Sequence, residues 1–119
     1  MKKDDSAYLR HILDAIEQIK NYLKGVSAEQ FLQKRLLQDG VVRRLEIIGE
    51  ASRNLSDGLR QRHPEVPWGQ IISLRNRITH AYFDVDLHIV WEIVQNDLLP
   101  LKQQVGRILE EMDEKDSEE

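Results

Sequence analysis

The apolar residues of this 119-residue sequence recur at steps of three and four, and no other feature limits the possible folds as strongly. An α-helix turns once in about 3.6 residues, so this spacing places apolar side chains on one face of an amphipathic helix. The first such stripe, within residues 6–24, consists of Leu9, Ile12, Leu13, Ile16, Ile19 and Leu23. Nothing in the chain indicates a pair of strands, so the pattern predicts an all-α fold.

Local signals suggest where the first helices begin and end. Gly25 suits the C-terminal cap of the first helix. Ser27-Ala28-Glu29-Gln30 is a capping-box pattern, which predicts that a second helix begins near residue 28. Asp39-Gly40 interrupts its stripe and predicts a kink or a brief break, and the helix should end near Gly58. Residues 59–63 are expected to add one short turn of helix.

The positions of the prolines predict where helices begin, end and bend in the second half of the chain. Residues 63–67 form a connector, because a residue that precedes proline resists the helical conformation. Pro67 suits the first turn of a third helix, predicted from about Trp68 to His80. Asp86 can cap a last helix that runs to about Glu111, with a kink at Pro100.

These elements predict an antiparallel up-and-down bundle of four main helices plus a short extra helix, with a kinked last helix. The length suits a single domain, which we place at residues 1–111. Residues 112–119 are too polar to pack, and we expect an acidic, disordered tail there.

The composition excludes several kinds of protein. The chain has no cysteine, so it has no disulfide framework and no thiolate metal site. His11, His63 and His88 lack metal-ligand spacing, so no metal site is expected. No segment approaches the ~20 consecutive apolar residues of a membrane helix, and no apolar signal core follows the N-terminus. The sequence therefore predicts a cytoplasmic protein without a membrane segment.

The net charge of −4 is unevenly distributed. Residues 110–119 carry seven acids and one base, which leaves a charge of +2 for residues 1–109. Residues 34–77 contain nine bases and five acids. This segment allows a phosphate-bearing ligand without requiring one, and a solvated, arginine-rich helix face is the alternative.

The predicted third helix ends in polar residues that interrupt its apolar pattern, among them Arg75, Asn76 and His80. On a continuous helix Asn76 and His80 share a face, so the amide can orient the imidazole. Arg75 and His80 would lie about 140° apart around the axis. One helix does not bring both onto one phosphate, whereas a cleft that faces a second copy can. The spacing therefore suggests a composite site across a dimer.

Arginine and histidine suit metal-independent RNA cleavage. Histidine titrates near neutrality, so His80 can take the proton of a ribose 2′-hydroxyl or give one to the leaving 5′-oxygen. Arg75 stays charged and can stabilise the extra negative charge of the transition state. The spacing alone also allows a structural histidine at a helix C-terminus, where a positive ring suits the helix dipole.

At this point the sequence resembles a known family. Arg75-x4-His80-x-Tyr82 looks like the signature of HepT-like toxins, within the HEPN superfamily. Further segments resemble the family's central helix, its approach to the motif and the start of its last helix. They are Leu45-Glu46-Ile47-Ile48-Gly49-Glu50-Ala51, Pro64-Glu65-Val66-Pro67-Trp68, and Asp84-Val85-Asp86 with Val90-Trp91. The resemblance covers residues from about 8 to 110.

The resemblance implies a homodimer whose subunits together line one cleft, and a metal-independent endoribonuclease that acts as the toxin of a type II/VII-like toxin–antitoxin pair. It implies Arg75 and His80 as the catalytic pair, with Asn76 as the supporting polar residue. It also implies a partner, a minimal nucleotidyltransferase antitoxin, that transfers AMP from ATP to Tyr82. The toxin itself would need no cofactor.

Control through Tyr82 has a physical basis. An AMP group there adds a negative charge and a bulky purine near the site, which would repel and occlude the RNA phosphate. Without the resemblance, a half-buried aromatic whose hydroxyl finds a partner is the better interpretation of Tyr82.

Glu46 and Glu50 lie one helical turn apart on the second helix, and both can face the cleft. Pairing with Arg43 or Arg53 on the surface is their favoured alternative. We expect Gly49 to permit close helix packing, and the two tryptophans to be anchors of the core or of a dimer.

Two other functions remain open at the level of sequence. One is a non-catalytic, nucleotide- or partner-binding helical dimer that accompanies a nucleotidyltransferase and uses Arg75 and His80 to hold a phosphate. The other is a structural helical dimer whose partner does all the chemistry.

Overall fold

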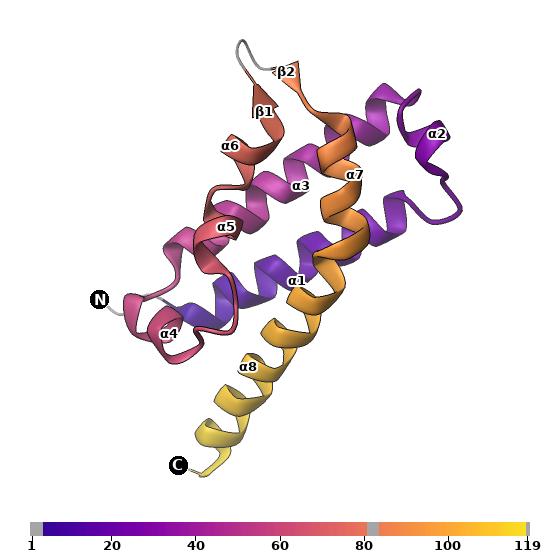
Figure 1. The fold of residues 1–119 in the computed structure, drawn as a ribbon. Helices are drawn as coiled ribbons and strands as arrows, with labels where there is room; N and C mark the ends of the chain where they lie inside the picture. The colour runs from indigo at the N-terminus through magenta and orange to yellow at the C-terminus, as the bar shows by residue number, and fades with distance from the viewer. Residues whose placement is uncertain (1–3, 81–83, 119) are drawn as a thin grey trace.

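The computed structural model describes residues 4–80 and 84–118, apart from the side chains of residues 80 and 116–118. Within this part of the chain the fold is helical, with one short strand pair (Figure 1). In chain order the elements are α1 (Asp5–Tyr22), α2 (Ala28–Phe31), α3 (Arg35–Asn54), α4 (Asp57–Arg62), α5 (Trp68–Ile72), α6 (Leu74–Ile78), β1 (Thr79–His80), β2 (Asp84–Val85), α7 (Leu87–Asn96) and α8 (Leu98–Glu118). The predicted all-α helical bundle is confirmed.

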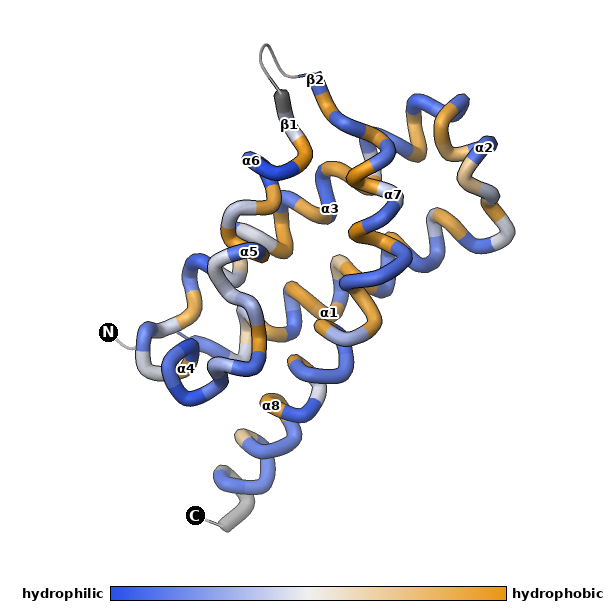
Figure 2. Tube along the Cα trace, viewed as in Figure 1, coloured by the Kyte–Doolittle hydropathy of each residue, from blue (hydrophilic) through white to orange (hydrophobic). Residues whose placement is uncertain are grey.

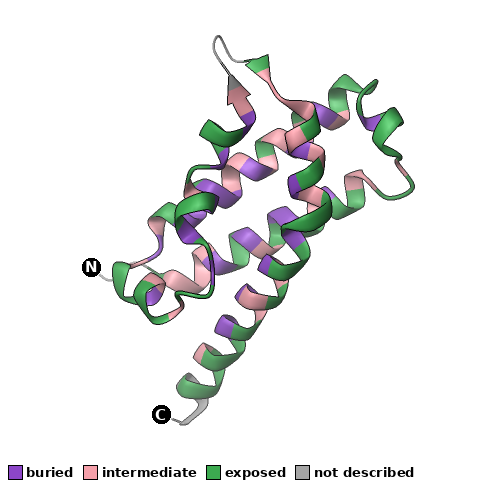
Figure 3. Ribbon diagram, viewed as in Figure 1, coloured by how far each residue is buried: buried purple, intermediate pink, exposed green. Residues whose placement is uncertain are grey.

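The core lies between α1, α3 and α8. α1 packs mainly on α3 and α8, and the opposite side of α3 carries α5 and α6. The hydrophobic and buried residues accordingly lie on the sides of the helices that face one another (Figures 2 and 3). The largest fully buried side chains include Leu9, Ile12, Ile19, Phe31, Leu45, Ile48, Leu55, Leu59 and Ile78. Burial of each such side chain contributes about 1.5–3 kcal/mol, so the stripes seen in the sequence build the core.

The second predicted helix is interrupted at a different place from the one expected. The capping box at Ser27 is present, but the break falls at residues 32–34, between α2 and α3. Gln38, which is buried, donates a hydrogen bond of 2.9 Å from Nε2 to the carbonyl oxygen of Phe31 and so satisfies the end of α2. α3 continues through Gly40, where a Cβ atom would lie 3.2 Å from the ring of Tyr22. The predicted break at Asp39-Gly40 is therefore wrong, because Gly40 makes room for a neighbouring ring.

The predicted helix from Trp68 to His80 is shorter and broken. α5 and α6 are separated at Ser73, and α6 ends at Ile78. The backbone N–H of Asp86 donates a hydrogen bond of 2.7 Å to the carbonyl oxygen of Ile78, which no residue of α6 satisfies. Thr79 then pairs with Val85 in the antiparallel ladder of β1 and β2. The expectation that the chain has no strand pair is thus wrong, although the ladder is only two residues long on each side.

The last helix is divided as its proline suggested. α7 begins at the predicted cap, Asp86, whose carboxylate accepts hydrogen bonds from the backbone of His88 and Ile89. α7 and α8 meet at Asp97, because Pro100 cannot donate to the carbonyl group of residue 96 and its ring crowds that group. α8 does not end near Glu111 but continues to Glu118. The backbone of residues 112–118 is therefore helical, where the sequence had suggested a disordered tail.

No helix in the described part of the chain combines the length and the apolar character that crossing a membrane requires.

Candidate active site

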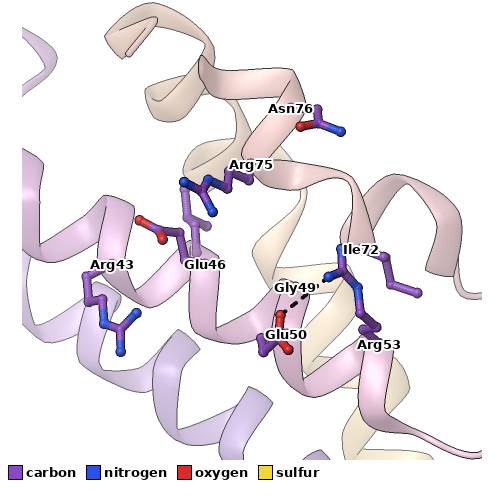
Figure 4. A pocket seen from close by; sticks show the side chains of 9 residues that line it. Arg43, Glu46, Gly49, Glu50, Arg53, Ile72, Arg75 and Asn76 are labelled. Carbon is purple, nitrogen blue, oxygen red and sulfur yellow. Dashed lines mark ion pairs between the residues drawn. The ribbon is translucent and has the colours of Figure 1, made fainter. Parts of the chain in front are cut away.

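A surface cleft of about 500 Å³ lies between α3 and the α5–α6 segment (Figure 4). It brings together three of the residues predicted from the sequence, Arg75, Asn76 and Glu50. Its full lining is Arg43, Leu45, Glu46, Gly49, Glu50, Arg53, Ile72, Arg75 and Asn76. The cleft is thus polar, with an apolar floor at the contact between the two helical segments.

The close approach of α3 to α5 forms the floor of the cleft. Gly49, in the middle of α3, is buried beneath the backbone carbonyl groups of Ile71 and Ile72 at the end of α5. The backbone turns at Ser73 immediately afterwards, and α6 then carries Arg75 over α3. The prediction that Gly49 permits close helix packing is confirmed.

The charges in the cleft are arranged unequally. Glu50 pairs with Arg53 at 3.7 Å on the exposed surface of α3. Arg75 is exposed and makes no ion pair with any described residue. Its guanidinium and the carboxylate of Glu46 point toward one another in Figure 4. With three arginines and two glutamates, the cleft carries a net positive charge. The guanidiniums of Arg43 and Arg75 form no ion pair with a described residue, so both are open to an anion.

Asn76 lines the same cleft but is oriented differently from Arg75. Its amide points away from Arg75 and Glu46 in Figure 4. Asn76 is exposed, so its amide is accessible to a ligand or to a second protein chain.

His80 does not lie on the helix that carries Arg75. Its backbone belongs to β1, paired with Asp84, and its side chain is outside the described part of the structure. The helical geometry used to relate residues 75, 76 and 80 therefore does not apply, because α6 ends before His80. The shared face of Asn76 and His80 and the angle of about 140° are corrected accordingly. Tyr82, the predicted modification site, lies outside the described residues.

Neither Arg43 nor Arg53 was predicted to be a site residue, and for Glu46 the sequence left open whether it faces the cleft or pairs with an arginine on the surface. Arg43, Glu46, Glu50 and Arg53 follow one another at steps of three or four along α3, and Gly49 interrupts the stripe. This polar stripe, which lies beside the family-like segment 45–51, is the signal that could have identified them.

Trp68 belongs to the core, and Trp91, which is half-buried, packs against it. Trp68 is only 7% exposed, and its Nε1–H donates a hydrogen bond of 3.0 Å to the carbonyl oxygen of His63. The ring of Trp91 lies 5.3 Å from that of Phe31. Both therefore anchor the core, one of the two roles expected for them.

In the described part of the chain, no group of three or more histidine, aspartate or glutamate side chains could hold a metal ion.

Comparisons with known proteins agree with the motif. A family model described as "Ribonuclease HepT-like" matches residues 12–108. A "Probable ribonuclease HepT" of Thermococcus cleftensis is 40% identical over 102 residues, which cover 86% of this chain and 93% of that protein. A "Putative RNase" of Caldanaerobacter subterraneus is 40% identical over 108 residues, covering 91% and 96% of the two chains.

A longer protein is also similar. The "Gamma-glutamylcyclotransferase and putative RNase" of Methanocaldococcus jannaschii is 42% identical over 113 residues, which cover 95% of this chain. The chain spans only 51% of that relative's length. No solved structure matches this chain.

Proposed function

Because this chain belongs to the HepT-like ribonuclease family, we propose that it is an endoribonuclease whose catalytic groups are Arg75 and His80. The observation that carries the proposal is the guanidinium of Arg75, which lies in an open, polar cleft at the first position of the family-like motif and forms no ion pair with a described residue. An exposed guanidinium without a carboxylate partner can bind a phosphate by donating hydrogen bonds to its oxygens.

The proposed reaction needs three events at one phosphodiester. The ribose 2′-hydroxyl loses its proton and its oxygen attacks phosphorus, the bond to the 5′-oxygen breaks, and that oxygen gains a proton. Arg75 stabilises the charge that develops on the phosphoryl oxygens, and the imidazole of His80 carries a proton. The products are a 2′,3′-cyclic phosphate and a free 5′-hydroxyl. No step requires a metal ion.

Purified protein tests this directly. Wild type should cleave single-stranded RNA in EDTA and leave cyclic phosphate ends, which mass spectrometry of the fragments detects. His80→Ala and Arg75→Ala should each lower the rate by about 100-fold or more, the range typical of a lost acid–base group or oxyanion donor. A wild type that binds RNA without cutting it would instead support the phosphate-binding dimer.

We propose that the active unit is a homodimer whose site draws Arg75 from one copy and His80 from the other. The exposed position of Arg75 and the end of α6 at Ile78, before His80, support a site completed by a second copy. Mixing Arg75→Ala with His80→Ala protein should then restore activity, because half of the composite sites in a mixed dimer hold both groups. Mass spectrometry verifies that mixed dimers have formed. If they have formed and activity is still not restored, each copy must supply both catalytic groups of its own site.

The family resemblance further supports a toxin that is silenced by a nucleotidyltransferase antitoxin, through transfer of AMP from ATP to Tyr82. Expression of wild type alone should arrest growth and degrade RNA, whereas His80→Ala should not. After incubation with the antitoxin and ATP, intact-mass spectrometry should show added AMP on wild type but not on Tyr82→Phe. Equal toxicity of the His80→Ala variant would contradict the assignment of His80.

A further inference from the structure

We propose that Glu46 is a third catalytic residue of the cleft and accepts the proton of the attacking 2′-hydroxyl. This inference rests on the proposed ribonuclease function. Cleavage of RNA needs one group that takes a proton and one that gives a proton. Among the described residues that line the cleft with Arg75, the side chains that can take up a proton are the carboxylates of Glu46 and Glu50, and none is an imidazole.

The two carboxylates of the cleft differ in their partners. Glu50 is exposed and paired with Arg53 at 3.7 Å, so its charge is already partly compensated. Glu46 is half-buried and forms no ion pair or hydrogen bond with a described residue. Its carboxylate points toward Arg75, the residue proposed to hold the phosphate (Figure 4). Of the two, Glu46 is therefore free to accept a proton next to a bound phosphodiester.

Glu46 borders a second hollow besides the cleft. It also lines a neighbouring groove, with Gln38, Val42, Asp84 and Leu87 among its other residues, between the first half of α3 and β2 with the start of α7. An RNA strand whose phosphate contacts Arg75 can place its ribose or base toward this groove. Glu46 stands at the boundary between the two hollows, where the sugar beside that phosphate would lie.

The proton balance of the step is simple. One carboxylate oxygen of Glu46 takes the 2′-hydroxyl proton while the 2′-oxygen bonds to phosphorus. The bond from phosphorus to the 5′-oxygen breaks, and His80 protonates that oxygen. Glu46 afterwards returns its proton to water. Arg75 stabilises the charge on the phosphoryl oxygens and takes no proton.

The test compares Glu46→Gln with Glu50→Gln, two glutamates of one cleft, one helical turn apart. Glu46→Gln keeps the size of the side chain but cannot accept the proton, so kcat should fall by about 100-fold. The acidic limb of its pH–rate profile should also flatten. Glu50→Gln frees Arg53, so it should alter KM for RNA and keep the acidic limb. Circular dichroism melts of both variants verify folding.

A modified substrate distinguishes the role of Glu46 as the base from that of His80 as the acid. When sulfur replaces the bridging 5′-oxygen at the mapped cleavage site, the leaving group needs no proton. His80→Ala should then recover most of its lost rate, whereas Glu46→Gln should stay slow. Recovery of Glu46→Gln on this substrate, or an acidic limb equal to that of wild type, would overturn the assignment of Glu46 while leaving the ribonuclease intact. A wild type that cuts neither RNA would reject the ribonuclease and this inference together.

Discussion

A Cβ atom placed on Gly49 of α3 would lie 3.1 Å from the carbonyl oxygen of Ile71 in α5. This oxygen belongs to the backbone, so it cannot move aside as the end of a flexible side chain can. The contact therefore sets how closely α5 approaches α3, and with it the position of Arg75 above the cleft.

We predict that Gly49→Ala lowers the free energy of unfolding by about 1 kcal/mol. Overpacking costs about 1–3 kcal/mol, and the better helix propensity of alanine returns about 1 kcal/mol. Gly106→Ala is the matched control, because nothing lies within 4 Å of its Cβ position in the middle of α8. It should stabilise the protein by about 0.5–1 kcal/mol. Urea denaturation measures both, and equal gains in stability would show that the contact at Gly49 relaxes easily.

A second prediction concerns the contact between the start of α1 and the cap of α4. The carboxylate of Asp5 accepts hydrogen bonds from the backbone N–H of Ser56 at 2.9 Å and from its hydroxyl at 2.7 Å. Hydrogen bonds to a charged group contribute about 1.5–3 kcal/mol, so Asp5→Ala should destabilise the protein by about 2 kcal/mol. Asp14→Ala, which removes only an exposed contact with Gln18 on the same helix, should change stability by less than about 0.5 kcal/mol.

A double-mutant cycle tests this second prediction further. Ser56→Ala removes the hydroxyl that bonds to Asp5 and also caps the backbone of Leu59. The two single substitutions should be non-additive by about 1 kcal/mol, as expected for residues in contact. Strict additivity would mean that the contact contributes nothing to stability.

A third prediction separates the arginines of the cleft by their binding of RNA. Arg75 pairs with no carboxylate among the described residues, whereas Arg53 is paired with Glu50. On an uncleavable 2′-O-methyl RNA, Arg75→Ala should weaken binding by about 10-fold and reduce the slope of log K against log salt by about 1. Arg53→Ala should weaken binding less. Fluorescence anisotropy at several salt concentrations measures both, and an equal or larger loss with Arg53→Ala would reverse the assignment.

A fourth prediction concerns pH. The hydroxyl of Ser6, which donates a hydrogen bond of 2.6 Å to Asp4, lowers the pKa of that carboxyl group, and the backbone N–H of Ala7 lowers it further. Because the pKa is depressed in the folded state, this cap stabilises α1 above the unfolded pKa, and the benefit is lost as the pH falls through the folded pKa. Ser6→Ala should therefore raise the pKa of Asp4 in an NMR titration.

Arg10 provides the control for this titration, because its charge is the weakest of the influences that lower the pKa of Asp4. Arg10→Ala should shift the titration midpoint less than Ser6→Ala does. The opposite order would assign the lowered pKa to charge and not to the hydrogen bond of the cap.

The sequence by itself determined the helical class, the faces that build the core and the family to which the chain belongs. It also determined the capping box at Ser27 and the cap at Asp86, because such signals act within a few residues along the chain. The cap predicted at Gly25 is displaced: α1 ends with Leu23 as its C-cap, and Gly25 takes a positive φ of 73° in the turn that follows. The buried face of α1 could likewise be predicted, since the periodicity of apolar residues indicates which side of a helix is buried.

Only the tertiary structure decided where helices break and which charged side chains face one another. α3 continues through Gly40, where the ring of Tyr22 packs against the helix and leaves little room for a side chain. α6 ends at Ile78, whose carbonyl oxygen accepts a hydrogen bond from the backbone N–H of Asp86. Arg75 faces Glu46 because Gly49 lets α5 approach α3 closely. Each of these depends on a group distant in sequence, and helix periodicity carries no information about which distant group will fill a space or complete a hydrogen bond.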